Sequence, residues 1–229
     1  NSSKTKKLYA KAFGISEEFV YPIGLPKTDE LLKRIAQVRR DRKNPYKEEI
    51  YKKYQIPEDK KLLLYAPTFR DQEIKKPQIE KQLQELLEGM PEGYILGLRL
   101  HPFVSKALKQ IPESSNICQL SFEEDANTVL MASDLLITDY SSIIFEYCLT
   151  LQPMIFYAYD YEEFSNNGRG FYYPYEKYVP GPVAYTGREV CQLIQDNQFD
   201  ISILEEFVNC NYEYLDGNAT KRLIQLIED

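Results

Sequence analysis

The chain has 229 residues, of which 43% are hydrophobic and 13% aromatic, so it can bury a sizeable core and is not a disordered chain. Its 28 basic residues against 35 acidic ones give a formal net charge of −7, which argues against a general nucleic-acid-binding protein. No apolar stretch approaches the ~20 residues that span a bilayer, and we expect no signal peptide. Because residue 1 is asparagine and not methionine, we expect the chain to be a segment of a longer protein.

The N-terminal quarter of the chain is predicted to be helical. Residues 1–58 have the pattern of a helical lead-in or linker from a preceding half, and residues 59–229 that of one α/β core with C-terminal helices. A basic helix is expected from Lys4 to Phe13. Thr28 or Asp29 is suited to cap the next helix, whose apolar residues recur at helical spacing.

Strands alternate with helices from residue 61 onward. Six short apolar runs are predicted as strands, at 62–66, 94–100, 116–120, 134–138, 154–157 and 182–185. Helices are expected around 79–86, 104–108, 125–132 and 141–149, then, after a long loop, at 188–195, 201–210 and 219–227. This alternation predicts an α/β fold with a doubly wound, mainly parallel, Rossmann-like sheet and helices on both of its faces.

Cysteine and histidine usage excludes several classes of protein. Four cysteines are spread widely without a C-x-x-C pair, which favours a reduced, intracellular protein over a disulfide-bonded one. The single histidine, His101, rules out zinc fingers, H-E-x-x-H proteases and three-histidine zinc sites. The dinucleotide-binding, P-loop and serine-hydrolase motifs are also absent.

Polar side chains collect where the predicted strands end. In an open parallel sheet the carboxyl ends of the strands meet at one edge, and ligands bind there. The sequence therefore predicts a site at this edge. The candidate residues are Thr68 and Arg70 after the first strand, Arg99 and His101 at the end of the second, Glu123 after the third, and Asp139, Ser141 and Ser142 after the fourth.

Ser141 and Ser142 stand at the first turn of a predicted helix. Free backbone N–H groups and the positive end of the helix dipole favour an anion there, so a phosphate or pyrophosphate is the natural guest. Simple N-capping by serine is the alternative. The neighbouring Arg70, Arg99 and His101 favour phosphate binding.

Several of the other candidates can be interpreted either as functional residues or as ordinary surface residues. His101 is suited to act as an acid, a base or a phosphate ligand near neutral pH, or is a surface histidine bonded to the backbone. Arg99 shares its face of the sheet only if the strand continues to His101. Arg70 is suited to neutralise phosphate as a planar fork, or is a surface arginine. Glu146, one turn into the serine helix, can reach a ribose hydroxyl or is an exposed helix glutamate.

The loop around 169–182 is rich in Tyr, Gly and Pro. We interpret it as a lid or an acceptor-facing loop that carries Arg169, with packing against the sheet edge as the alternative.

Eight segments, in order along nearly the whole chain, carry a family resemblance. They are GLPKTD at 24–29, YAPTFRD at 65–71, LRLH at 98–101, SDLLITDYSS at 133–142, PMIFY at 153–157, RGFY at 169–172, PGP at 180–182 and DGNA at 216–219. The sequence resembles the CDP-glycerol glycerophosphotransferase family, which makes teichoic acid in Gram-positive bacteria. The T-D-Y-S-S run with R-x-H upstream is the most specific part of the match.

The resemblance implies that this chain is the C-terminal, nucleotide-binding half of a two-domain transferase of the GT-B type. A second catalytic histidine, in a W-H-G context, is expected in the N-terminal half, and this chain has no tryptophan. The full protein is expected to be cytoplasmic and peripheral at the inner face of the cell membrane. The roles carried over by the resemblance are His101 and Arg99 as catalytic residues, Ser141, Ser142, Arg70 and Thr68 at the phosphates, and Glu146, Asp139 and Glu123 at the nucleotide or its ribose.

The expected reaction is transfer of glycerol phosphate from CDP-glycerol, or of another polyol phosphate from its CDP derivative, to a hydroxyl of a polymer or lipid-linked acceptor. No cofactor, no metal and no nucleic acid is expected, and membrane contact is expected only through the missing half. The isolated chain is expected to be inactive. The alternatives are a ribitol-phosphate transferase, a nucleotide-sugar glycosyltransferase of the GT-B type, and a nucleotide-binding module that catalyses nothing.

Overall fold

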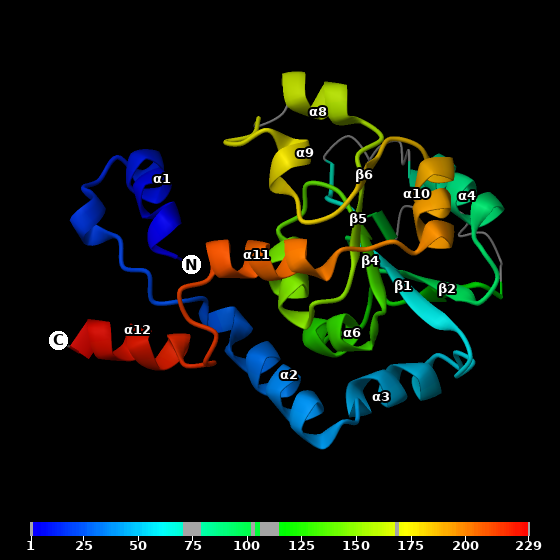
Figure 1. Cartoon of the computed structure of the whole chain (residues 1–229), viewed down its shortest axis with the longest axis horizontal. Coiled ribbons are helices and arrows are strands. Elements are labelled where there is room, and N and C mark those ends of the chain that lie inside the picture. The colour runs from blue at the N-terminus through cyan, green and yellow to red at the C-terminus, as the bar shows by residue number, and fades with distance from the viewer. Residues whose placement is uncertain (1, 71–78, 102–103, 106–114, 168–169, 229) are drawn as a thin grey trace.

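The computed structural model describes residues 2–70, 79–101, 104–105, 115–167 and 170–228 (Figure 1). The strands are β1 (Lys61–Tyr65), β2 (Tyr94–Leu98), β3 (Ile117–Gln119), β4 (Leu135–Thr138), β5 (Met154–Tyr157) and β6 (Val183–Ala184). The α-helices are α1 (Ser3–Phe13), α2 (Asp29–Asp41), α3 (Pro45–Lys53), α4 (Ile79–Gly89), α6 (Ala126–Ala132), α7 (Ile143–Tyr147), α8 (Tyr161–Asn167), α9 (Tyr175–Tyr178), α10 (Gly187–Asp196), α11 (Ile201–Asn211) and α12 (Ala219–Glu228). Short 3₁₀ turns are η1 (Glu17–Phe19), η2 (Pro26–Thr28) and η4 (Cys148–Thr150).

The described strands form one six-stranded parallel sheet in the order β3-β2-β1-β4-β5-β6. Leu64 of β1 lies opposite Gly97 of β2 on one side and Leu136 of β4 on the other. The chain winds outward from β1 to β3 and then returns to the other side of β1, so the winding direction reverses between β1 and β4. The predicted doubly wound parallel fold is confirmed, and its ligand-binding crevice is expected at this reversal point.

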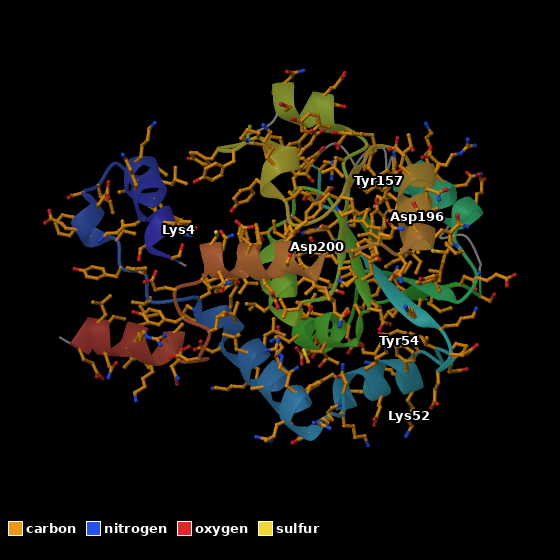
Figure 2. All side chains as sticks on the ribbon, viewed as in Figure 1. Lys4, Lys52, Tyr54, Tyr157, Asp196 and Asp200 are labelled. Atoms are coloured by element: carbon orange, nitrogen blue, oxygen red, sulfur yellow. The ribbon has the colours of Figure 1, made fainter. Side chains whose placement is uncertain are left out.

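Helices cover both faces of the sheet (Figure 1), and side chains fill the space between the layers (Figure 2). Successive strand residues point to opposite faces, so Leu63 packs toward α4 and α10 while Leu62 packs toward the layer formed by α2, α3, α6, α7 and α11. Because helices cover both faces of the sheet, both sets of strand side chains are buried, and the strands are continuous apolar runs in the sequence. Leu31 and Ile50, from the predicted lead-in, are fully buried in the same cluster as Leu62.

The segment after β5 is more ordered than the sequence suggests. It was predicted as one long loop, but it contains the short helices α8 and α9, and Tyr175 of α9 is buried with its hydroxyl donating to the carbonyl of Asp139 at 3.0 Å. The predicted helix from 141 to 149 begins only at Ile143 and tightens into a 3₁₀ turn at Cys148. Most of the predicted helix at 104–108 lies outside the described residues.

Asp29 caps a helix at the other end of the chain. Its carboxylate accepts hydrogen bonds from the backbone N–H groups of Ala219 (2.9 Å) and Thr220 (2.8 Å), the first two residues of α12. Neither Asp29 nor Thr28 caps α2 as predicted, because the Thr28 hydroxyl donates instead to the carbonyl of Leu25. Gly217, in the turn before α12, has a φ of +66° that allows the backbone to pass close to Asp29.

Replacing Asp29 with alanine should release α12 and lower the free energy of unfolding by about 0.5–2 kcal/mol, the usual value of a cap. Burial alone raises the pKa of Asp29, but the backbone hydrogen bonds from Thr220 and Ala219 outweigh it, so the folded-state pKa lies below the usual value. A depressed pKa means that this stabilisation is complete above about pH 4 and is lost as the pH falls through the folded-state pKa.

Urea unfolding at pH 7 and again near pH 3 checks this expectation. The difference in unfolding free energy between wild type and Asp29→Ala should shrink at the lower pH. The exposed Asp59 provides the matched control, and Asp59→Ala should change little at either pH. An equal effect of the two substitutions at pH 7 would contradict the capping role.

Candidate functional site

The carboxyl ends of β1, β2 and β4 enclose a cavity of about 360 Å³ at the reversal point of the sheet. Four of the residues predicted for a site line it together, although they come from three different segments of the chain. They are Thr68 after β1, Arg99 and His101 after β2, and Ser141 after β4. Ligand pockets in proteins begin at about this size.

Within the described residues, no carboxylate forms an ion pair with the positive charge of Arg99. One of its guanidinium nitrogens, Nη1, donates to the backbone carbonyls of Leu120 and Glu123, both at 3.1 Å. It makes no salt bridge with any described residue. Burial lowers the pKa of the Arg99 guanidinium, against the opposing effect of the acidic groups around it. A half-buried cation that makes no direct ion pair with a described carboxylate is a natural binding point for an anion.

His101 lies beside Arg99 because the hydrogen bonding of β2 continues past its last residue. The N–H of Arg99 donates to the carbonyl of Tyr65 at 2.9 Å, and the N–H of Leu100 donates to the hydroxyl of Ser121 at 2.9 Å. The imidazole of His101 is exposed and stacks on the ring of Phe69, with 4.4 Å between the centroids. The prediction that this strand carries both side chains to one site is consistent with their shared cavity.

Thr68 lines this cavity, and its hydroxyl has no partner in the described part of the chain. Its backbone N–H donates to Asp139 at 2.7 Å, which fixes the residue, while the buried Oγ1 atom makes no hydrogen bond there. Leaving a buried hydroxyl unsatisfied costs about 1–3 kcal/mol. A bound oxyanion would satisfy this group, so the unpartnered hydroxyl is consistent with the predicted phosphate contact.

Arg70, by contrast, is already neutralised. Its guanidinium donates to both carboxylate oxygens of Asp160 (2.7 and 2.9 Å), to Asp139 (2.7 Å) and to the carbonyl of Thr68. The two carboxylates and the arginine are mostly buried, and Asp139 is only 1% exposed. The structure therefore places Arg70 and Asp139 beneath the cavity, as a brace between the loops that follow β1, β4 and β5.

Glu123 is also engaged by the protein itself. Its carboxylate accepts hydrogen bonds from Lys53 (2.7 and 2.8 Å) and from the hydroxyl of Tyr54 (2.7 Å), which lies at the end of α3 (Figure 2). These bonds, the one from Lys53 first, hold the pKa of Glu123 below its usual range. Its backbone carbonyl accepts the hydrogen bond from Nη1 of Arg99. In this geometry Glu123 supports the arginine, and its predicted nucleotide contact stays a prediction.

The two consecutive serines point to different places. Ser141 lines the cavity of Arg99 and His101, and its hydroxyl accepts from the N–H of Ile143 at 3.4 Å. Ser142 is exposed, makes no capping hydrogen bond to the described backbone, and lines a second cavity beyond α7. Glu146, one turn further along α7, pairs with Lys27 through Oε1, while its buried Oε2 has no partner among the described residues.

Three residues without a predicted role complete the site: Phe69, Ser121 and Asp160. Phe69 supports the His101 ring, Ser121 holds the backbone of Leu100, and Asp160 neutralises Arg70. Each follows a strand, so the rule that located the other candidates could have indicated them. The predicted Arg169 lies outside the described residues.

Two further observations concern metals and membranes. Within the described ranges, no group of three or more His, Cys, Asp or Glu side chains is arranged to hold a metal ion. The expectation that no metal is required stays a prediction.

No helix of the described chain is long and apolar enough to cross a membrane. All four cysteines, each in a described segment, are free thiols.

A family assignment follows from comparison with known proteins. The sequence model of the family described as CDP-Glycerol:Poly(glycerophosphate) glycerophosphotransferase matches residues 1–229, the whole chain. The chain belongs to this family. The resemblance drawn from its motifs is therefore confirmed.

Relatives and solved structures place the chain within longer proteins. It is 33% identical over 231 residues to a teichoic acid poly(ribitol-phosphate) polymerase of Bacillus spizizenii, covering 99% of this chain and 36% of that protein. It is 31% identical over 231 residues to a teichoic acid glycerol-phosphate primase of Bacillus subtilis, covering 100% of this chain and 56% of that protein. A variant of the wall teichoic acid polymerase TagF superposes with a TM-score of 0.80 at 28% identity, covering 99% of this chain and 56% of that structure.

A more distant neighbour shows the fold alone. The UDP-GlcNAc 2-epimerase of Neisseria meningitidis has a TM-score of 0.65 at 16% identity and covers 97% of this chain and 59% of that structure. The epimerase and this chain therefore share a fold.

Substitution by methionine should destabilise the protein much more at Arg70 than at Arg99. Arg70→Met leaves Asp139 and Asp160 buried without their partner and should lower the unfolding free energy by about 3–5 kcal/mol. Arg99→Met removes a cation that pairs with no carboxylate, so it should cost much less stability. Urea unfolding of both variants checks this difference. Equal destabilisation would contradict the assignment of Arg70 as the brace and of Arg99 as a binding group.

Proposed function

We propose that this chain is the nucleotide-binding part of an enzyme that transfers glycerol phosphate from CDP-glycerol to an acceptor hydroxyl in teichoic acid or a related polymer. Four observations support the proposal: membership of the family, a parallel sheet with its crevice at the reversal point, a cavity there lined by hydroxyls and an imidazole, and above all the uncompensated charge of Arg99. The TagF structure obtained after a CDPG soak belongs to a protein with the same fold at 27% identity.

In the proposed reaction the acceptor oxygen attacks the phosphorus that bears glycerol. The new P–O bond forms as the bond from that phosphorus to the bridging oxygen breaks, and CMP leaves with the electron pair. We assign the proton of the acceptor hydroxyl to the histidine that the family resemblance implies for the other half. Contact with the inner face of the membrane is likewise assigned to that half.

The residues of this chain stabilise the charge that develops on the leaving phosphate. Arg99 and His101 line one cavity together with Thr68 and Ser141, so a guanidinium, an imidazole and two hydroxyls are available as donors. Donors that are fixed before the reaction stabilise a transition state without reorganisation cost. Arg70 contributes indirectly, because it holds the segments from which these groups project.

Replacing Thr68 with valine should weaken CDP-glycerol binding and leave the fold intact. Valine has the same branching, and the Thr68 hydroxyl has no hydrogen bond within the described chain to lose. A hydrogen bond to a charged phosphate contributes about 1.5–3 kcal/mol, so affinity should fall roughly ten- to hundredfold. Calorimetric titration of the chain with CDP-glycerol, alongside thermal unfolding, checks both parts.

The two serines provide a matched pair for the same titration. Ser141→Ala should weaken CDP-glycerol binding, whereas Ser142→Ala should have the smaller effect, because only Ser141 lines the cavity of Arg99. CDP-ribitol and UDP-GlcNAc are titrated in parallel, since the names of the relatives include both ribitol-phosphate and glycerol-phosphate enzymes. Tighter binding of UDP-GlcNAc than of either CDP-polyol would favour a glycosyltransferase instead.

His101→Ala should reduce turnover of the full-length enzyme by roughly 10²–10³-fold, the range that removal of one fixed hydrogen-bond donor costs. The side chain is exposed, so the unfolding free energy should change little. Initial rates with CDP-glycerol and purified acceptor provide the measurement. A variant with near-wild-type turnover would remove His101 from the mechanism.

A further inference from the structure

A second cavity, of about 510 Å³, lies between α1, α7, α9 and α11. Aromatic rings form much of its wall, including those of Phe145, Tyr172, Tyr173 and Tyr178. The rings of Tyr173 and Tyr178 are stacked, with 5.0 Å between the centroids, while Tyr172 is 72% exposed. We call this second cavity the tyrosine cavity, and the loop that carries Tyr172, Tyr173 and Tyr178 is the one interpreted above as a lid or an acceptor-facing loop.

The tyrosine cavity adjoins the cavity of Arg99 through a single peptide unit. Ser141 lines the first cavity and Ser142 the second. Because these two serines are consecutive in the chain, the two cavities meet at the turn before α7. A transferase needs its two substrates close together, because an acceptor hydroxyl must approach the phosphorus of the bound nucleotide.

The polar groups of the tyrosine cavity include an ammonium group and a hydroxyl. Glu146 uses one of the three N–H donors of the Lys27 ammonium, and the 55% exposed side chain retains the others at the cavity wall. Ser142 adds an exposed hydroxyl. Tyrosine rings combine an apolar surface, which can contact the C–H groups of a polyol, with a hydroxyl that can hydrogen-bond its oxygens. This combination suits a short polyol that carries one phosphodiester.

We propose that the tyrosine cavity binds the terminal polyol-phosphate unit of the acceptor polymer. The inference rests on the proposed function, because it supplies the second substrate of the same reaction. A nucleobase is the competing occupant, but a base is recognised by convergent donors and acceptors. The amide of Asn211, which would be suited to that task, is already engaged by the hydroxyl of Tyr178 (3.1 Å) and the carbonyl of Phe207 (2.9 Å).

Binding of bis(glycerol) phosphate, two glycerols joined by one phosphodiester, tests the proposal. The probe is titrated into the chain by NMR with CMP held at saturation, so that the cavity of Arg99 is occupied. We expect the probe to bind, and Tyr172→Ala to weaken its binding roughly three- to tenfold, as loss of an aromatic contact does. Tyr21→Ala is the matched control, because Tyr21 is also exposed (55%) but does not line the cavity, and it should change nothing.

CDP-glycerol affinity, measured on the same variants, separates this inference from the proposed function. Tyr172→Ala should leave that affinity unchanged. If the chain binds CDP-glycerol but not the probe, or binds the probe equally well in Tyr172→Ala, the acceptor site is overturned and the proposed function stands. If Tyr172→Ala weakens CDP-glycerol instead, the cavity belongs to the nucleotide. If the probe binds with the expected Tyr172 dependence while CDP-glycerol does not bind, the cavity stands and the nucleotide assignment fails.

Discussion

The buried ion pairs of Arg70 are the constraint on which the rest of the site depends. One guanidinium joins the loops that follow β1, β4 and β5, because it binds Asp139 and Asp160 as well as the carbonyl of Thr68. Asp139 also fixes the N–H of Thr68. Buried charges of this kind are tolerated only when each keeps its partner, so the three loops adopt one arrangement together. The walls of the cavity above are therefore set by a network that itself has no need of a ligand.

Arg70 and Arg99 both follow a strand of the sheet, but they have different roles. Arg70 is balanced by two carboxylates, so it adds rigidity and little net field. Among the described residues, Arg99 donates hydrogen bonds to carbonyl oxygens, whose partial charges do not cancel a full positive charge, so its field extends into the cavity. The net negative charge of the chain does not oppose this attraction. Salt screens the distant exposed acidic groups, whereas the nearby charge of Arg99 in a partly desolvated cleft is screened much less.

Much of the fold and part of the site could be predicted from the sequence. The strands were recognisable because both faces are covered, which makes each an apolar run such as that of β1. Strand order then brought Thr68, Arg99, His101 and Ser141 to one edge. The function of Arg70 could not be predicted, since it depends on where a carboxylate 90 residues away points. The separation of Ser141 from Ser142 depends on the turn before α7, and the helices α8 and α9 are too short to give a periodic signal.

The cap that Asp29 provides for α12 also orders the events of folding. The hydrogen bond from Ala219 to Asp29 closes a loop of 190 residues, and nearly all of the sheet lies within that loop. Closing it costs the least entropy once the intervening chain is already compact. During synthesis Asp29 emerges before Ala219 and after only part of the described chain, so α12 docks onto a core that has already formed. This docking joins two segments that are far apart in sequence, and the carboxylate that receives α12 is synthesised first.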